Sequence, residues 1–170
     1  MAMYLQETTL DIVERVGVTL FQKRTPLLTA GDRRGYNTMT IGWGGLGTLW
    51  RKPVCTVYVR PQRYTYEFME QNNWFTVSIL PETMEEALRI CGTKSGRDID
   101  KCKSCGLTVG YAEGDAPYPK EAELVLVCRK LYADDLRPEK FTDASLNEAF
   151  YPEHDYHRAY VGEIVQVLAK

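Results

Sequence analysis

The chain has 170 residues, of which 44% are hydrophobic and 26% are charged, and its formal net charge at pH 7 is −2. These values are typical of one folded globular domain spanning residues 1–170, and they exclude an intrinsically disordered chain. General DNA or RNA binding is also excluded as the main role, because the chain lacks the excess of Lys and Arg that such proteins carry.

Nothing in the sequence indicates a membrane partner. The longest aliphatic run, residues 124–127, is far shorter than the ~20 apolar residues of a membrane-spanning helix. The N-terminal string MAMYLQETTLDIVERV has no basic start followed by an apolar core, so no secretory signal is predicted. We therefore expect a cytoplasmic protein.

Short β-rich segments bounded by turn residues dominate the first half of the chain. They predict strands at residues 27–30, ending at Gly31-Asp32; 36–43, ending at Gly44-Gly45; 54–59, ending at Pro61; and 74–80, ending at Pro81. A short helix is predicted from residue 66 to about residue 72, with Thr65 as its N-cap.

A second short helix is predicted to begin at Thr83. Thr83 and Glu86 have the spacing of a capping box, in which each side chain satisfies a backbone amide of the other residue. Met84, Leu88 and Cys91 then recur on one face of this helix.

The last third of the chain contains two predicted strands separated by a long loop. Residues 124–132 are almost continuously apolar, which indicates a strand buried on both faces, and residues 160–168 form the final strand. Residues 134–159 contain Pro and acidic residues without periodicity, which predicts a loop with at most one helical turn.

Six strands with few helices favour a mainly β fold, an antiparallel barrel that is closed or partly closed. A parallel α/β sheet is the weaker alternative, because no strand is followed by a long helix in regular alternation. We therefore expect one barrel domain with a few short helices.

The five cysteines, an odd number, indicate free thiols. Cys102 and Cys105 have CxxC spacing, which is half of a zinc site that Cys128, His154 or His157 would have to complete. A redox CxxC begins a helix after a strand, whereas a Gly and a strand-like segment follow this one. We favour two thiols on a loop and predict no metal site.

The segment Arg60-Pro61-Gln62-Arg63-Tyr64-Thr65 joins a predicted strand to a predicted helix. The first-turn amides, the helix dipole, the Thr65 hydroxyl and the guanidinium groups of Arg60 and Arg63 make an anion site, with phosphate as its natural ligand. Alternatively, both arginines are solvated surface charges and Thr65 only caps the helix.

Two further segments are candidates for ligand binding. In residues 36–45, small and hydroxylated residues followed by glycines would let a flat ring lie against the strand, with Trp43 beside it. The alternative is an edge strand with a core Trp. The turn Ser95-Gly96-Arg97-Asp98 is either a second anion-facing turn or a salt-bridged loop.

Together, these segments resemble the flavin reductase-like family of FMN-binding split barrels. The resemblance extends from about residue 27 to the C-terminus, through NTMTIGWGG (37–45), KPVCTVYVRPQRYT (52–65), NWFTVSIL (73–80), SGRDIDK (95–101), CGLT (105–108) and HRAYVGEIVQV (157–167). It is the order of these strings that carries the resemblance.

The resemblance implies a homodimer of six-stranded split barrels that holds FMN at or near the subunit interface. It implies that the isoalloxazine ring is contacted by Asn37, Thr38, Met39, Thr40 and Trp43. It assigns the ribityl phosphate to Arg60, Arg63 and Thr65, and it makes Ser95, Gly96 and Arg97 a further contact on the phosphate side or from the partner chain.

The sequence shows no catalytic triad and no paired carboxylates, which is consistent with chemistry carried by a flavin rather than by a protein nucleophile. His154 and His157 are interpreted as surface groups or as part of a lid bordering the flavin. Glycines 42, 44, 45 and 47 do not fit GxGxxG, so NADH or NADPH would bind only transiently.

The expected function is that of an FMN-dependent oxidoreductase that takes electrons from NADH or NADPH and passes them to free flavin or another small-molecule acceptor. One alternative is an FMN-bearing electron carrier that exchanges electrons with partner proteins. The other is a binding protein that kept the barrel and lost the cofactor.

Overall fold

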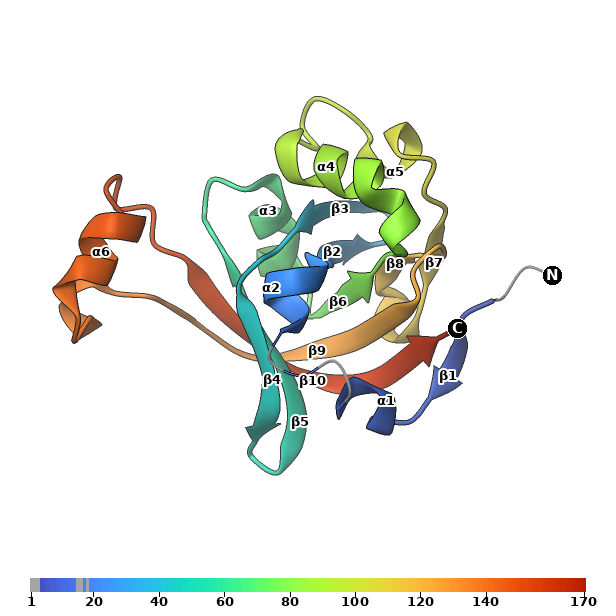
Figure 1. The fold of residues 1–170 in the computed structure, drawn as a ribbon, viewed down its shortest axis with the longest axis horizontal. Helices are drawn as coiled ribbons and strands as arrows, with labels where there is room; N and C mark the ends of the chain where they lie inside the picture. Colours follow the sequence, from blue (N-terminus) through green and yellow to red (C-terminus); the bar gives the residue numbers. More distant parts are fainter. Residues whose placement is uncertain (1–3, 15–16, 18) are drawn as a thin grey trace.

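The computed structural model describes residues 4–14, 17 and 19–170, and its main feature is an antiparallel β-sheet (Figure 1). The strand order is β3-β2-β6-β9-β10-β5-β4, and β1 pairs with β10 outside this order. The strands are β1 (Gln6–Thr8), β2 (Leu27–Asp32), β3 (Gly35–Thr40), β4 (Gly44–Leu49), β5 (Lys52–Val59), β6 (Trp74–Ile79), β9 (Leu124–Asp135) and β10 (Arg158–Ala169). Residues 1–3, 15 and 16 of the N-terminal string, for which no secretory signal is predicted, lie outside the described residues.

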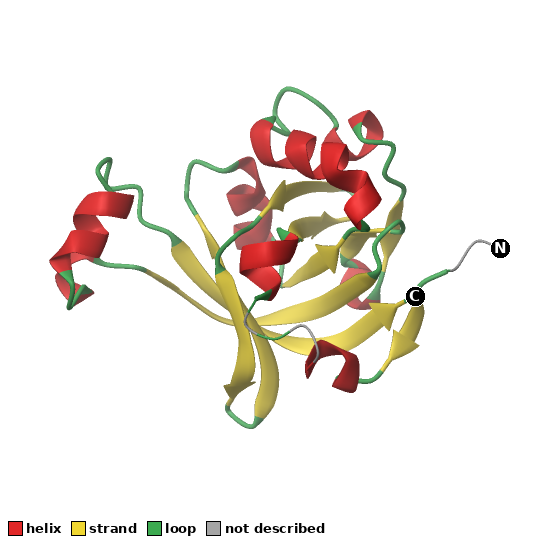
Figure 2. Cartoon of the chain, viewed as in Figure 1, coloured by secondary structure: helices red, strands yellow, loops and turns green. Residues whose placement is uncertain are grey.

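The helices are short and are placed around the sheet, as Figure 2 shows. They are α1 (Asp11–Glu14), α2 (Leu20–Arg24), α3 (Tyr64–Gln71), α4 (Glu85–Thr93), α5 (Lys101–Ser104) and α6 (Ala144–Phe150), with 3-10 turns at Glu82–Met84, Glu113–Asp115 and Pro138–Lys140. A separate small hairpin consists of β7 (Val109–Tyr111) and β8 (Pro117–Pro119). In the described part of the chain, no helix is both long enough and apolar enough to cross a membrane.

The predicted mainly β fold is confirmed, because all six predicted strands are present and every strand pairing is antiparallel. The parallel α/β alternative is therefore wrong. The sheet also contains β1 and β4, which were not predicted. Some strand ends differ as well: β2 continues through Gly31 and Asp32, and β3 ends at Thr40.

Strand β9 supplies residues to both hydrophobic clusters of the core. Leu124, Leu126 and Cys128 belong to one buried cluster, whereas Val125 and Val127 belong to the other. Successive side chains of a strand point to opposite faces, so a strand buried on both faces must be apolar at every position. The prediction of two-sided burial is confirmed for this part of the strand.

The turn predicted at Gly44-Gly45 is wrong, because these glycines begin β4, which pairs with β5. A Cβ atom at Gly44 would lie 2.4 Å from the Phe21 ring, so the glycine allows the close approach of α2. The β4–β5 hairpin turns at Trp50 and Arg51, whose φ angles are +50° and +58°. Tight hairpins usually place Asn or Gly at positions with positive φ. The sequence has neither residue here, so the hairpin was not predicted.

Both predicted helices exist, but neither begins as predicted. Helix α3 starts at Tyr64, with Arg63 as the N-cap residue, and Thr65 lies buried inside the first turn. Helix α4 starts at Glu85, and Thr83 lies in the preceding 3-10 turn, so the predicted capping box does not form.

The predicted apolar face of α4 is confirmed. Cys91 is buried in the second core cluster, and Met84, at the N-cap, and Leu88 pack against that cluster. The hydrophobic spacing was therefore a better guide to this helix than the capping residues.

The predicted loop at residues 134–159 is wrong in part. Strand β9 continues to Asp135, β10 begins at Arg158, and α6 has seven residues rather than a single turn. We call the connection, residues 136–157, the arm. Figure 1 shows that it carries α6 away from the sheet, at the left of the view.

Candidate functional site

A cavity of about 260 Å³ lies beside β3, between the start of α3 and the end of α4. Its wall includes eight residues that the sequence singled out, namely Asn37, Met39, Thr40, Arg63, Thr65, Ser95, Gly96 and Arg97. The predicted anion turn, the predicted ring-binding strand and the turn at residues 95–97 therefore meet around one space, although up to 60 positions separate them in the sequence.

Two further cavities adjoin the first. One, of about 180 Å³, shares Met39, Thr40 and Arg63 with it and adds Trp43 and Arg60. The other, of about 460 Å³, lies on the side of Tyr36 and Phe68 and shares Asn37, Tyr64, Gly96, Arg97 and Lys101. Ligand sites usually occupy about 300–1,000 Å³, so the first cavity reaches the size of a ligand site only together with its neighbours.

Asn37 connects the three predicted segments. Its buried side chain donates a hydrogen bond from Nδ2 to the Thr65 hydroxyl at 2.7 Å, which ties β3 to α3. A Cβ atom at Gly96 would come within 1.9 Å of the Asn37 Oδ1, so only glycine allows the loop after α4 to approach this closely. The Thr65 hydroxyl thus holds the strand instead of capping the helix.

Thr38 contributes its backbone rather than its side chain. Its hydroxyl is buried, receives a hydrogen bond from the Thr29 hydroxyl at 3.0 Å and lies 3.3 Å from the Leu28 carbonyl oxygen. Its carbonyl oxygen instead accepts a hydrogen bond from Lys101 at 2.9 Å. Asn37 and Met39 line the 260 Å³ cavity and Thr38 does not, as the alternation of side chains along a strand predicts. Thr40, the last residue of β3, departs from this alternation and also lines the cavity.

Lys101 is a buried member of the site that the sequence analysis did not select. Its Nζ donates to the carbonyl oxygens of Thr38 on β3, at 2.9 Å, and of Cys91 on α4, at 2.8 Å. Burial lowers the pKa of this ammonium group, and the positive charge of Arg63 acts in the same direction. The only sequence signal was its place at the end of the string SGRDIDK.

The wall of the 260 Å³ cavity is strongly cationic. It contains Arg63, Lys94, Arg97 and Lys101, and among the described residues that form it there is no Asp or Glu. Arg97 is partly neutralised, because it pairs with Glu67 and stacks over the Tyr64 ring with its guanidinium carbon 4.8 Å from the centroid. The turn at residues 95–98 therefore combines both alternatives: it borders the cavity, as an anion-facing turn would, and its Arg97 is salt-bridged.

Arg60 lies differently from Arg63, although both were predicted to bind the same anion. Arg60 forms an ion pair with Asp155 of the arm and donates to the Phe150 carbonyl oxygen at 2.9 Å. Gln62 donates to the same carboxylate at 2.5 Å. These contacts lower the pKa of Asp155 and fix the arm against the body of the molecule.

His157 borders the 180 Å³ cavity, as the lid interpretation requires. Its ring lies 4.7 Å from the Trp43 ring, and its Nδ1 lies 2.9 Å from the Tyr151 hydroxyl. Burial, together with the charge of Arg60, lowers the pKa of His157 to about 4, so the imidazole is neutral at pH 7. His154 is exposed, as the surface interpretation requires.

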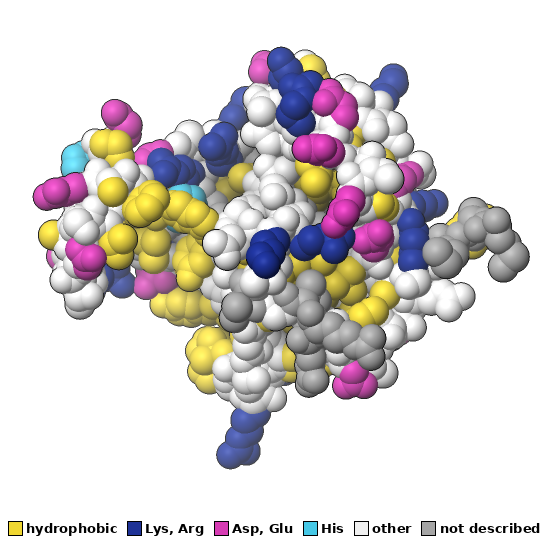
Figure 3. Space-filling view, viewed as in Figure 1, with side chains coloured by type: hydrophobic (Ala, Val, Ile, Leu, Met, Phe, Trp, Pro, Cys, Tyr) yellow, Lys and Arg dark blue, Asp and Glu magenta, His cyan; other side chains and the backbone are white. Residues whose placement is uncertain are grey.

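The surface view agrees with this arrangement. Figure 3 shows Lys, Arg and His side chains gathered between the body of the molecule and the arm, whose surface carries both hydrophobic and acidic side chains. Trp43 and Phe150, which pack edge to face at 5.5 Å, remain 42% and 45% exposed there. The site therefore has a cationic side and an apolar side.

The cysteines are free thiols, as predicted, but the loop expected for the CxxC pair is wrong. Cys102 is buried within α5, and Cys105 is the C-cap of that helix. The Sγ of Cys105 lies 3.9 Å from the Sγ of Cys91, a residue that lines the 260 Å³ cavity. No group of three or more His, Cys, Asp or Glu within the described ranges is placed to hold a metal ion.

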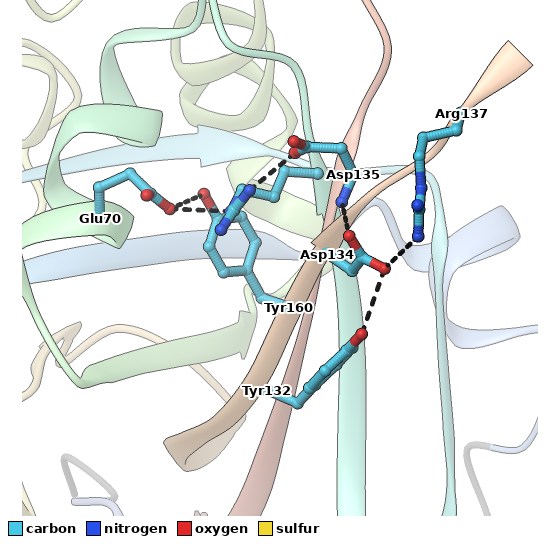
Figure 4. A network of polar contacts seen from close by, with 7 residues as sticks. Glu70, Tyr132, Asp134, Asp135, Arg137 and Tyr160 are labelled. Carbon is cyan, nitrogen blue, oxygen red and sulfur yellow. Dashed lines mark hydrogen bonds and ion pairs between the residues drawn. The ribbon is translucent and has the colours of Figure 1, made fainter.

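A second polar network lies outside the cavities and connects α3 with β9 and β10 (Figure 4). The buried Tyr160 hydroxyl donates to Glu70 at 2.7 Å, and Arg158 pairs with Asp135 at 2.9 Å. Asp134 accepts from Tyr132 and Arg137. None of these residues lines the three cavities described above, so we interpret the network as support for the strands that lead into the arm.

Comparison with known protein families gives one match to most of the chain. The model of the flavin reductase like domain matches residues 19–170. A search of curated proteins finds no match. The family match covers every cavity residue described above.

Solved structures show the same fold. Flavoredoxin from Methanosarcina acetivorans is 28% identical, with a TM-score of 0.66 over 85% of this chain and 67% of that one. An FMN-binding domain of a flavin reductases-like enzyme from Shewanella baltica is 20% identical, with a TM-score of 0.68 over 97% of this chain and 76% of that one. Nitrilotriacetate monooxygenase component B from Bacillus cereus is 17% identical, with a TM-score of 0.65 over 95% and 77%. The last two similarities concern the fold alone.

Proposed function

The chain belongs to the flavin reductase-like domain family, and from that premise we propose that it is an FMN-dependent oxidoreductase. In this proposal the electron donor is NADH or NADPH, which binds transiently, and the acceptor is free flavin or another small molecule. The observation that carries the proposal is the meeting of a cationic wall with the strand of Asn37 to Thr40 around one space.

The donor groups of the cavity fit FMN. A phosphate dianion needs cations and amide donors, and four basic residues line the space without an acidic one among the described wall residues. Arg63 stands at the first turn of α3, where the helix dipole also favours negative charge. The close approach of Gly96 to Asn37 brings the turn on the phosphate side next to the strand on the ring side.

The proposed roles of the residues follow their positions. Arg63, Ser95, Gly96 and Arg97 bind the phosphate, and Lys101 adds charge from beneath the cavity. Asn37, Met39, Thr40 and Trp43 face the ring, Thr38 acts through its backbone, and Thr65 positions Asn37. Arg60 supports the site by holding the arm, because its charge is already paired with Asp155.

Bound FMN would supply two-electron redox chemistry. The chain's own residues bind and orient it and exclude water. The neutral His157, packed beside Trp43, forms an uncharged part of the wall of the site. The proposed reaction requires no protein nucleophile.

We also propose a homodimer, in a single domain of residues 1–170, located in the cytoplasm. Apolar side chains on and next to the arm remain exposed, including Leu146 at 46%. Together with Trp43 and Phe150 they make an apolar surface of the kind that a subunit interface covers. Size-exclusion chromatography with light scattering tests this, and a monomer at micromolar concentration contradicts it.

A second candidate function is electron transfer to a partner protein by bound FMN. Its support is the similarity to the flavoredoxin of Methanosarcina acetivorans. The two functions need the same cavity and differ in their reaction with nicotinamide nucleotides.

Two measurements test the proposal. A flavin absorption band in the purified protein, or quenching of FMN fluorescence on titration, is expected, and a colourless protein that ignores FMN contradicts both functions. Stopped-flow mixing of the FMN-loaded protein with NADH and with NADPH then separates them. Bleaching within seconds by either nucleotide indicates the reductase, and none indicates the carrier.

A further inference from the structure

Three cysteines gather where α4 and α5 pack together, at the back of the 260 Å³ cavity. Cys91 is 1% exposed and Cys102 is 4% exposed, whereas Cys105 is half-buried at the end of α5. The Sγ atoms of Cys91 and Cys105 are 3.9 Å apart, although 14 positions separate the residues. A disulfide bond is about 2.05 Å long, so joining them needs a movement of about 2 Å.

We propose that Cys91 and Cys105 form a reversible disulfide bond behind the cavity, made by exchange with a low-molecular-weight disulfide. The Cys105 thiolate attacks one sulfur of that oxidant, and its other half leaves as a thiolate. The Cys91 thiolate then attacks the Cys105 sulfur of the mixed disulfide and displaces the second half. Two protein thiols are oxidised, one small disulfide is reduced to two thiols, and the protons released by the cysteines balance those taken up.

The order of attack follows from exposure. Cys105 is reachable from solvent, whereas Cys91 is enclosed by α4 and the core. Burial raises the pKa of both thiols, to about 12 for Cys91, so exposure decides the order and Cys91 serves as the second, intramolecular reactant.

The structure favours this pair over the CxxC pair that the sequence displays. The Cys105 side chain points toward α4, where its Sγ also lies 3.7 Å from the Ala87 carbonyl oxygen. Cys102 is buried in the second core cluster, as Cys91 is, so the Sγ–Sγ contact of Cys91 with Cys105, rather than burial, favours the Cys91–Cys105 pair. A Cys102–Cys105 bond would require Cys105 to turn away from its present contacts.

The bond would act on the cavity through two contacts of α4. The Cys91 carbonyl oxygen accepts from the Lys101 ammonium at 2.8 Å. The next residue, Gly92, packs against β3, where an added Cβ would lie 2.6 Å from the Thr40 hydroxyl oxygen. Drawing Cys91 toward Cys105 therefore changes the wall shared by α4 and β3.

The first experiment maps the bond and does not depend on any ligand. The full chain is incubated with oxidised glutathione, free thiols are alkylated, and the peptides are identified by mass spectrometry. We expect a Cys91–Cys105 disulfide, with two fewer alkylated cysteines, that dithiothreitol reverses. Cys105→Ser should abolish it, and Cys102→Ala should retain it. A Cys102–Cys105 bond, a stable glutathione adduct on Cys105 or no disulfide overturns the proposal.

The second experiment measures the effect on the cavity, and this part rests on the proposed function. FMN fluorescence titration of the oxidised and reduced chain should show about tenfold weaker binding after oxidation, the equivalent of one lost hydrogen bond. Equal affinities overturn the coupling to the cavity. Failure of the reduced chain to bind FMN contradicts the proposed function and leaves the mapped disulfide standing.

Discussion

The cavity wall and the arm both use arginines from one short turn, but they use them differently. Arg60 faces the arm, where Asp155 neutralises it. Arg63, three residues later, faces the cavity, whose described wall residues include no carboxylate. The charge of Arg60 is therefore neutralised in an ion pair that holds the arm, whereas the charge of Arg63 can interact with a ligand in the cavity.

This difference shows that the type of residue does not by itself assign an anion site. Two guanidinium groups in one turn look equivalent in sequence. The carboxylate that pairs with only one of them, Asp155, lies 95 positions after Arg60. Arg60 offers less to a ligand than Arg63 does, because binding would first have to break its contacts with Asp155 and Phe150. Arg97 is intermediate, since its pairing with Glu67 is more exposed to solvent.

The largest effect is expected from removing the available charge. Arg63→Ala should weaken FMN binding by about 1.5–3 kcal/mol, the value of a charge-assisted hydrogen bond. The matched variant Arg60→Ala should change FMN affinity by less than about threefold, because its charge is already paired. Fluorescence titration measures both. If the two variants lose affinity equally, the distinction between the arginines is wrong.

Lys101 extends the test to a buried charge. Lys101→Met keeps the length of the side chain but leaves the carbonyl oxygens of Thr38 and Cys91 without their donor. Each unsatisfied buried group costs about 1–3 kcal/mol, so the free energy of unfolding should fall by at least about that amount. Urea denaturation measures it. Lys103→Met, an exposed change in the same helix, is the control and should leave the midpoint unchanged.

The arm side has its own test in the pH dependence of stability. The folded-state pKa of His157 is about 4, below the usual 6.5, so the unfolded chain takes up this proton first on acidification. The His157 contribution is therefore complete above about pH 6.5 and is lost as the pH falls from there to about 4. Allowing for partial exposure, we expect a loss of about 1–2 kcal/mol.

A pair of histidine variants assigns that pH dependence. Arg60, Arg63, Asp155 and the Tyr151 hydroxyl face His157 and contribute to the charge around it. His157→Gln should flatten the fall in unfolding free energy between pH 6.5 and 4. The variant of the exposed histidine, His154→Gln, should keep the wild-type slope. If the unfolding free energy of His157→Gln still falls between pH 6.5 and 4 as in the wild type, groups other than His157 cause the pH dependence.

The sequence predicted the sheet and most of the cavity, because both depend on local patterns. Continuous apolar residues identified β9, and the turn after β5 identified the cationic end of the site. The β4–β5 hairpin was missed because Trp50 and Arg51 occupy turn positions where Asn or Gly is usual. Helix α6 was missed although Asp143 caps it by accepting from the Ser145 amide.

What the sequence could not show is the pairing of distant side chains. The Thr65 hydroxyl looked like a helix cap, and its actual partner, Asn37, lies 28 positions earlier. Lys101 was not selected, because its two carbonyl acceptors belong to other elements. Such contacts depend on the packing of helices over β3, which no periodicity encodes.

The smallest effect, and the sharpest test of the comparison, comes from releasing the paired charge. Asp155→Asn keeps the shape of the side chain but removes the negative charge beside Arg60, so the guanidinium group gains freedom at the edge of the cavity. The Arg60–Asp155 pair is only 24% and 18% exposed, but the released charge lies at the edge of the cavity and is screened by solvent, so FMN affinity should rise by only about twofold. The double variant Arg60→Ala/Asp155→Asn should lose this gain, since no charge is then released. An unchanged affinity in Asp155→Asn, measured at low salt where the charge of Arg60 is least screened, would mean that Arg60 lies too far from the phosphate to act on it even when it is free.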